Sequence, residues 1–207
     1  MKRTTNNLNY KIKPFSTVTE FHGHICPGSA IGYKAAKIAI KELSSVFSDD
    51  EELVCITEND TCAVDAIQVL TGCTFGKGNL IFQDYGKQTY TFINRETEDA
   101  VRISMKNSFN VDNIDPNLSK LRKKVNSGKA SELEKEDLRK SIDKVSEEIL
   151  NLSDDEIFNI EHVKAGIPEK ARIFKSIKCH KCGEMISMHR AKEINDDYYC
   201  IPCSRTK

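Results

Sequence analysis

The amino-acid sequence predicts an α+β fold: a helix–strand–helix–three-strand core, then a helical hairpin and a small cysteine-rich module at the C-terminus. Three observations predict it. In the first half of the chain, apolar residues recur at helical and then at strand spacing. From residue 116 the chain becomes dense in Lys, Glu, Asp and Leu, and two C-x-x-C pairs lie near its end. We expect a core over residues 1–115, a helical segment over residues 116–163 that completes or extends it, and the small module over residues 164–207.

Composition excludes several classes of protein. The chain has 207 residues, no net charge, 39% apolar residues and 30% charged residues. No apolar run approaches the ~18 residues of a membrane span, and the basic start lacks the apolar stretch of a secretory signal. We therefore expect a cytoplasmic protein with no membrane partner. Residues 164–207 hold 10 Lys and Arg against 5 Asp and Glu, which fits either an ordinary solvated surface or an acidic partner such as nucleic acid.

The first helix is expected to begin at Pro27, because proline suits the first turn of a helix, and to extend to about Phe47. Gly28, Gly32 and Ala36 form a stripe of small residues along it. Such a stripe lets another element approach the helix closely, so we expect a tight contact on this face.

One strand, a second helix and three strands should follow. The expected positions are a strand at 53–58, a helix capped by Asp60 or Thr61 and ended by Gly72, and strands at 79–85, 88–94 and 100–106. Gly86 and Lys87 lie between the first two strands of this last set, which predicts a hairpin.

Capping patterns mark the helical segment. Ser131 with Glu134, and Ser153 with Glu156, have the spacing of a capping box. Between them, apolar residues recur at steps of four, three and four, which places them on one face of a helix. We expect a helical hairpin that lies on the core or makes oligomer contacts, followed by a strand within residues 157–164.

Eight cysteines carry most of the chemical information. Without a secretory signal, metal or thiol chemistry is favoured over disulfides. Two C-x-x-C pairs are separated by 17 residues, and each such turn places two thiolates on one side of a tetrahedral metal. We predict a small C-terminal zinc-binding module whose structural ligands are Cys179, Cys182, Cys200 and Cys203. Iron in a rubredoxin-like site has the same ligands and stays open.

A second concentration of chemistry lies near the start, where His22, His24 and Cys26 fall within five residues just before Pro27. Cys26 would lie at a helix N-terminus, where free N–H groups and the helix dipole favour a thiolate. In an extended segment the three side chains share one side. We favour a functional site over the alternative, which is a capped helix entry with two ordinary histidines.

Cys62 lies at the start of the second predicted helix. Two thiols at two helix N-termini can converge on one metal or substrate. We therefore predict a second metal in the core, with His24, Cys26 and Cys62 as its ligands and with His22 as a further ligand or proton relay.

Cys73 follows eleven residues after Cys62. Along a continuous helix the two would lie about 16 Å apart, so they share an ion only if the chain folds back at Gly72. Cys73 also belongs to a glycine-rich turn over residues 72–79, whose N–H groups and Lys77 can meet an anionic group. A tight loop before a strand explains this turn equally well. Cys55, inside an apolar strand, is expected in the core.

Three motifs, in this order, resemble the FmdE family, which is named after a protein associated with molybdenum formylmethanofuran dehydrogenase operons. They are FHGHICPG, CAVDAIQVLTGCTFGKGNL, and PEKARIFKSIKCHKCGE with YYCIPC. The resemblance implies the same α+β core and, as in longer members, a C-terminal zinc finger. It also implies a metal or active site built from His22, His24, Cys26, Cys62 and Cys73.

We expect an accessory or catalytic component of one-carbon or redox metabolism, with an oxidoreductase role related to formylmethanofuran dehydrogenase and a small one-carbon or carbonyl substrate. Two alternatives stay open: a zinc-finger regulatory or nucleic-acid-binding protein, and a docking component of a larger enzyme. The charged helical segment and the stripe of small residues favour a homodimer.

Overall fold

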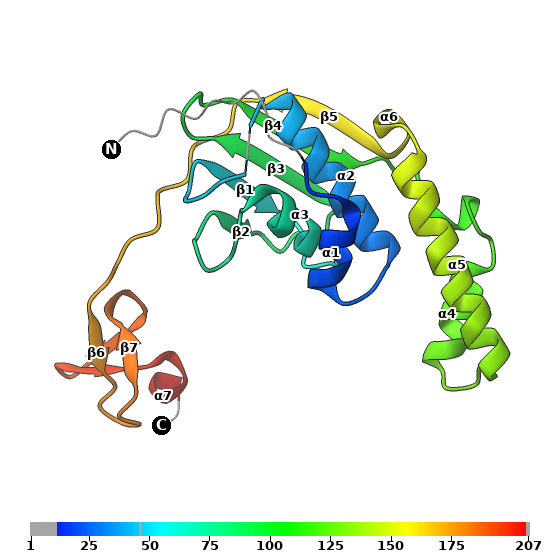
Figure 1. Cartoon of the computed structure of the whole chain (residues 1–207). Coiled ribbons are helices and arrows are strands. Elements are labelled where there is room, and N and C mark those ends of the chain that lie inside the picture. Colours follow the sequence, from blue (N-terminus) through cyan, green and yellow to red (C-terminus); the bar gives the residue numbers. More distant parts are fainter. Residues whose placement is uncertain (1–11, 46, 206–207) are drawn as a thin grey trace. The chain divides into compact units, whose positions relative to one another are not determined.

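The computed structural model describes residues 12–45 and 47–205. The chain divides into two compact units, the first ending at Lys170 and the second beginning at Ala171. Helices and strands both contribute to the first unit, which confirms the predicted α+β class (Figure 1). Among the described residues, no helix is both long enough and apolar enough to cross a membrane.

A five-stranded mixed sheet, in the order β2-β1-β3-β4-β5, forms the centre of the first unit. Its strands are β1 (Leu53–Thr57), β2 (Leu80–Phe82), β3 (Thr89–Asn94), β4 (Ala100–Met105) and β5 (Phe158–Val163). β1 and β2 are parallel, whereas the other neighbouring pairs are antiparallel. The last strand comes from the predicted segment 157–164 and closes the sheet at one edge.

The predicted hairpin at Gly86 and Lys87 is wrong, because β1 lies between β2 and β3. The chain leaves β2 and passes over the end of β1. There the Lys87 N–H donates to the Glu58 carbonyl at 3.0 Å, and the Glu58 N–H donates to the Thr89 carbonyl at 3.0 Å. The turn residues are therefore real, but they serve a crossing connection and not a two-strand hairpin.

Three helices cover one face of this sheet (Figure 1): α1 (Phe15–His22), α2 (Pro27–Glu42) and α3 (Ala63–Thr71). The large side chains of the sheet that face them, including Tyr90 and Phe92, are fully buried. A Cβ atom at Gly32 would lie 2.1 Å from the Ala63 carbonyl oxygen. The small-residue stripe thus lets α2 and α3 pack at close range, as the sequence predicts.

α1 was not expected from the sequence, although Pro14 and Gly23 bracket it. Pro14 occupies the N-cap position, and Gly23 ends the helix with a left-handed φ of 88°. This is the usual placement of proline before and glycine after a helix. The second predicted helix also differs from expectation at its start, because Cys62 and neither Asp60 nor Thr61 takes the N-cap position.

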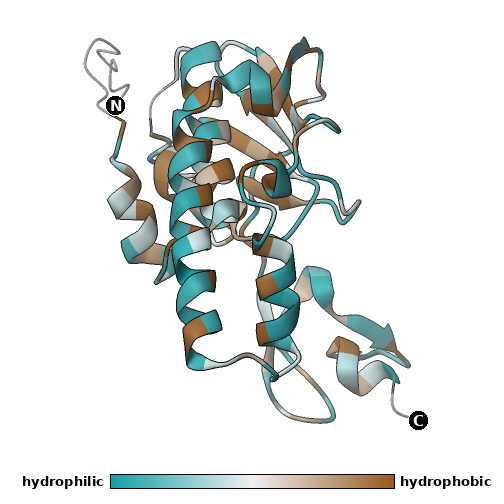
Figure 2. Ribbon diagram, turned by 90° about the vertical axis from the view of Figure 1, so that its right-hand side faces the viewer, coloured by the Kyte–Doolittle hydropathy of each residue, from teal (hydrophilic) through white to brown (hydrophobic). Residues whose placement is uncertain are grey.

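The predicted helical hairpin consists of α4 (Leu118–Asn126) and α5 (Glu132–Asn151). Both predicted capping boxes form, one at the start of α5 and one at the start of α6 (Asp154–Ile157). Leu138, Val145 and Ile149 of α5 are buried, and α5 packs against α2. Figure 2 shows that the remaining surface of the two helices is mostly hydrophilic.

The second unit is small and has two hairpins followed by a short helix. Its elements are β6 (Ser176–Lys178), β7 (Met185–Ser187), η3 (Met188–Arg190), β8 (Lys192–Ile194), β9 (Asp197–Tyr199) and α7 (Ile201–Arg205). β6 pairs with β7, and β8 pairs with β9. Most of its side chains are partly or fully exposed, so this unit has almost no apolar core of its own.

Candidate metal centres

The four C-terminal cysteines come together in the second unit. Their sulfur atoms all lie within 4.8 Å of one another. Cys179 and Cys182 occupy the turn after β6, where Gly183 adopts a φ of 77°. Cys200 directly precedes α7, and Cys203 lies in its first turn. A turn and a helix start therefore each contribute one pair, as the spacing predicts.

The surroundings of these sulfurs suit a bound cation. Backbone N–H groups of Cys182 and Cys200 lower the pKa of Cys179 to about 6, and the Cys200 N–H donates to its Sγ at 3.3 Å. By contrast, the neighbouring thiols raise the pKa of Cys203 to about 12, Cys200 most of all. Four thiols this close ionise together only when a cation offsets their charge. The cluster thus has the donor set of a structural metal site, which suits zinc and iron alike.

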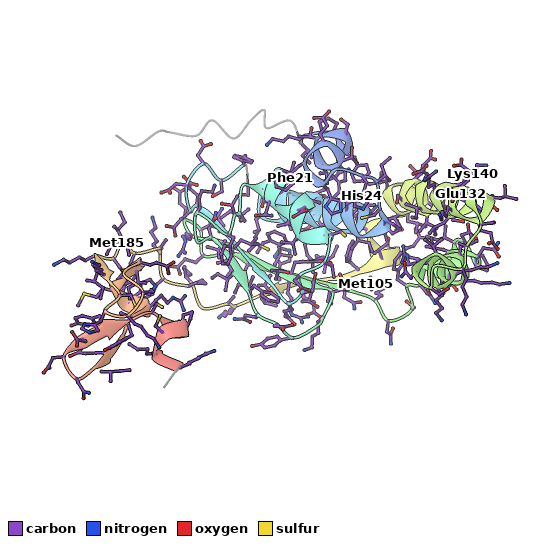
Figure 3. All side chains as sticks on the ribbon, turned by 90° about the horizontal axis from the view of Figure 1, so that it is seen from below. Phe21, His24, Met105, Glu132, Lys140 and Met185 are labelled. Atoms are coloured by element: carbon purple, nitrogen blue, oxygen red, sulfur yellow. The ribbon has the colours of Figure 1, made fainter. Side chains whose placement is uncertain are left out.

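The second cluster forms where α1 turns into α2. His22 is the last residue of α1, and Gly23 reverses the chain. The rings of His22 and His24 have centroids 4.5 Å apart, and the ligand atoms of His22, His24 and Cys26 lie within 4.8 Å of one another. His24 and its neighbour Phe21 are labelled in Figure 3. A helix end and a left-handed glycine bring these side chains together, so the predicted extended segment is wrong although the cluster itself forms.

Asp65, in the first turn of α3, orients His22. The Nδ1 atom of His22 lies 2.7 Å from Asp65 Oδ2, and this hydrogen bond raises the pKa of His22. With Nδ1 as the donor, Nε2 is left with its lone pair, 3.7 Å from the Cys26 Sγ. That distance is close to the edge of about 3.6 Å between an N and an S ligand of a tetrahedral zinc. Asp65, His22 and a metal ligand in line form the carboxylate–histidine arrangement typical of metal sites.

Cys26 occupies the N-cap position of α2, as predicted. Its Sγ accepts a hydrogen bond from the Ser29 N–H at 3.3 Å. Burial alone would raise the pKa of Cys26, but Ser29, the Cys62 thiol and His22 together hold it below the ordinary value. Cys26 is therefore the thiol of the first unit that is best prepared to bind as a thiolate.

Cys62 lies opposite Cys26, at the start of α3. A Cβ atom at Gly28 would be 3.8 Å from both sulfurs and 3.0 Å from the Cys62 Cβ, so the absence of a side chain there lets the two cysteines approach. Burial and the negative charge of Cys26 raise the pKa of Cys62. Cys62 thus stays protonated in conditions where Cys26 ionises.

Cys73 lies apart from this cluster, beyond the far end of α3. It is fully buried, its Sγ donates to the Leu53 carbonyl at 3.3 Å, and burial raises its pKa to about 12. Cys55 is also buried, in the core where it was expected. In the glycine-rich turn, Lys77 donates to the Ser48 carbonyl at 2.7 Å. This contact commits the lysine that was expected to meet an anion.

Asp65 is the functional residue that the sequence analysis did not single out. It belongs to the CAVDAIQ motif and follows Cys62 by three residues, so both lie on the first turn of one helix. This spacing was a usable signal, because residues three apart share a helix face.

A pocket of about 410 Å³ opens beside the core cluster. His22, Cys62 and Asp65 form one side of it. Thr57 and Phe82, the last residues of the parallel strands β1 and β2, form another. The carboxyl ends of parallel strands are a common place for ligands. The pocket thus gives a small molecule access to the Cys62 thiol and the His22–Asp65 pair.

Fold and sites together define a mixed α+β protein with cysteine-based metal-binding clusters. The chain belongs to the FmdE family, whose profile, described as "FmdE, Molybdenum formylmethanofuran dehydrogenase operon", matches residues 21–159. This confirms the resemblance seen in the sequence motifs. The matched region contains the whole core cluster, whereas the four C-terminal cysteines lie outside it.

Two similar proteins extend the comparison. A crystal structure of a tungsten formylmethanofuran dehydrogenase FmdE-like protein from Syntrophus aciditrophicus is 25% identical in sequence, with a TM-score of 0.55. The match covers 92% of this chain and 89% of that one. A "Probable S-adenosyl-L-methionine-binding protein" of Archaeoglobus fulgidus is 32% identical over 194 residues. That match covers 89% of this chain but 50% of the relative, so the chain spans about half the length of that protein.

Proposed function

We propose that this protein is a metal-dependent accessory or catalytic component of one-carbon or redox metabolism, related to formylmethanofuran dehydrogenase. In this proposal His22, His24 and Cys26 hold a second metal at the edge of the pocket, and a small carbonyl or one-carbon substrate enters beside Cys62. The observation that carries the proposal is the line from Asp65 through His22 to Cys26, with His24 as a third donor.

The protein residues have distinct roles in this site. Asp65 fixes the tautomer and the orientation of His22. Cys26 provides a thiolate whose charge is stabilised by the Ser29 N–H. Three protein donors leave one tetrahedral position for a substrate. A divalent metal held there would supply the positive charge that polarises a carbonyl oxygen.

Cys62 is placed to move a proton. It lines the pocket, and its raised pKa keeps the thiol protonated near neutral pH. A protonated thiol beside a polarised carbonyl can deliver its proton to the developing negative charge. The ion pair between Asp65 and His22 lies on the same side of the pocket and keeps the donor nitrogens ordered.

Elemental analysis of the purified full chain tests the proposal. We expect two metal ions per chain, one in each cluster. His24→Ala and Cys26→Ser should each leave one metal, whereas His162→Ala should keep both, because His162 is an exposed residue that pairs with Glu42 at 3.0 Å. A full chain with a single metal that is lost only when the C-terminal cysteines are replaced would contradict the proposal.

A further inference from the structure

The pocket beside Cys62 has an aromatic wall that faces solvent. Phe75 is 80% exposed and Phe82 is 45% exposed, and both line the pocket. Leu80 and Val64 lie deeper in the same lining. Two phenyl rings left open at a pocket mouth offer stacking and apolar contact to a planar ligand.

Apart from His22, the ionisable side chains known to line this pocket are acidic or thiol groups. Asp60 and Asp65 line it, and none of the described residues in its lining is Lys or Arg. The nearby basic side chains are directed elsewhere: Lys77 binds the Ser48 carbonyl, and Lys87 lies 3.9 Å from Glu58.

The two acidic residues differ in how far their charge is already offset. Asp65 is paired with His22 at 2.7 Å. Within residues 12–45 and 47–205, no hydrogen bond or ion pair engages the exposed Asp60 side chain. If a divalent metal occupies the core cluster, the Cys26 thiolate and the Asp65 carboxylate offset its two charges. The Asp60 carboxylate is then the remaining charge that faces the pocket.

We propose that the pocket selects a small cation with a planar, apolar body. The body stacks on Phe75 and Phe82, and the positive group lies near Asp60, where both the carboxylate and the ring faces favour it. This inference rests on the proposed function only for the reaction that follows binding, since the charge preference depends on residues outside the metal cluster.

Calorimetric titration of the full-length, metal-loaded protein with three probes of one shape tests this. The probes are tryptamine, indole-3-acetamide and indole-3-acetate, which are cationic, neutral and anionic at neutral pH. We expect tryptamine to bind about tenfold more tightly than the acetate, with the amide between them. Asp60→Asn should reduce the advantage of tryptamine over the amide to less than about twofold. Phe75→Ala should weaken all three probes.

Matched controls are Asp99→Asn and Phe174→Ala, which alter an exposed acid and an exposed aromatic residue outside the pocket. Both should bind the probes as the unaltered protein does. Equal binding of the three probes, a preference for the acetate, or a tryptamine preference that survives Asp60→Asn would each overturn the inference. Metal content measured on the same samples separates the two proposals. A protein with a filled core site and no charge preference refutes only the pocket inference. A protein with an empty core site and a clear cation preference refutes only the proposed function.

Discussion

At the scale of single residues, Asp65 is the group on which the orientation of His22 depends. Asp65→Asn keeps the size of the side chain but removes the charge that holds the Nδ1 proton. We expect the core metal to bind about 10- to 100-fold more weakly, as for other lost partners of ligating histidines. Competition with a chromophoric chelator at neutral pH measures this. Asp99→Asn serves as the control, and unchanged affinity in Asp65→Asn would show that Asp65 does not orient the ligand.

The residues of the core cluster also show which parts of a site a sequence reveals. His22, His24 and Cys26 lie within one short segment, so their spacing announces them. The contact between His22 and Asp65 joins residues 43 positions apart. Only the packing of α1 and α3 creates it. Cys73 shows the reverse: it belongs to the same sequence motif as Cys62, but the length of α3 separates them.

At the scale of elements, the close contact between α2 and α3 depends on Gly32. A Cβ atom there would overlap the Ala63 backbone, at 2.1 Å from its carbonyl oxygen and 2.5 Å from its Cα. Because backbone cannot move aside as a side chain can, we expect Gly32→Ala to lower the free energy of unfolding by at least about 3 kcal/mol. Denaturant unfolding measures the loss. Gly166→Ala, with open space around its Cβ position, should stay within about 0.5 kcal/mol.

The connection between β4 and the helical hairpin is held by Asp115. Its carboxylate accepts hydrogen bonds from the Ser141 hydroxyl at 2.7 Å and the Asn117 N–H at 3.0 Å. The Ser141 bond, followed by the Asn117 bond, lowers the pKa of Asp115. A lowered pKa in the folded state stabilises the fold fully above the unfolded-state pKa of about 3.9. That stabilisation is lost as the pH falls through the folded-state value.

Ser141→Ala should therefore cost about 1.5–3 kcal/mol at pH 7, and less when the pH falls below about 3.9. Urea unfolding at pH 7 and at pH 3 gives the two differences. Ser127→Ala removes an exposed hydroxyl that donates to the Lys124 carbonyl, and it should have a small effect that does not change with pH. A Ser141→Ala penalty that is equal at both pH values would mean that the Asp115 charge contributes nothing.

The elements also divide by how far the sequence could predict them. The starts of α2 and α5 follow from local signals, namely Pro27 and the Ser131 capping box. The strand order does not, because β1 lies between two strands that follow it in the chain. Strand pairing depends on contacts far apart in sequence, and a glycine turn between two strands leaves open whether they pair with each other or cross a third.

At the scale of the whole molecule, the two units hold their structure in different ways. The first buries a continuous apolar cluster, whereas the second is mostly exposed around its four cysteines. A small module of this kind takes most of its folding free energy from its metal. The place where the first unit ends is therefore set by packing, and the chain beyond β5 decides it.

The segment after β5 completes the first unit. Val163 pairs with Ala100 in the sheet, and Ala165 packs on the sheet face opposite the helices, against Val54 and Ile93. Further along, Arg95 donates to the carbonyls of Pro168 and, at 3.3 Å, Glu169. A chain that ends at Glu161 loses all of these contacts, whereas a chain that ends at Lys170 keeps them.

We therefore expect the chain that ends at Lys170 to unfold at the same temperature as the first unit of the full protein. The chain that ends at Glu161 should unfold roughly 5–15 °C lower, because it leaves the apolar face around Val54 open and Arg95 without its carbonyl partners. Differential scanning calorimetry of the three chains measures this, and metal analysis of the same samples reports the core cluster. Equal melting of the two shortened chains would mean that the segment after β5 adds nothing to the stability of the first unit. A lower melting temperature for both would mean that the second unit stabilises the first, against the separate origin of stability inferred for the two units.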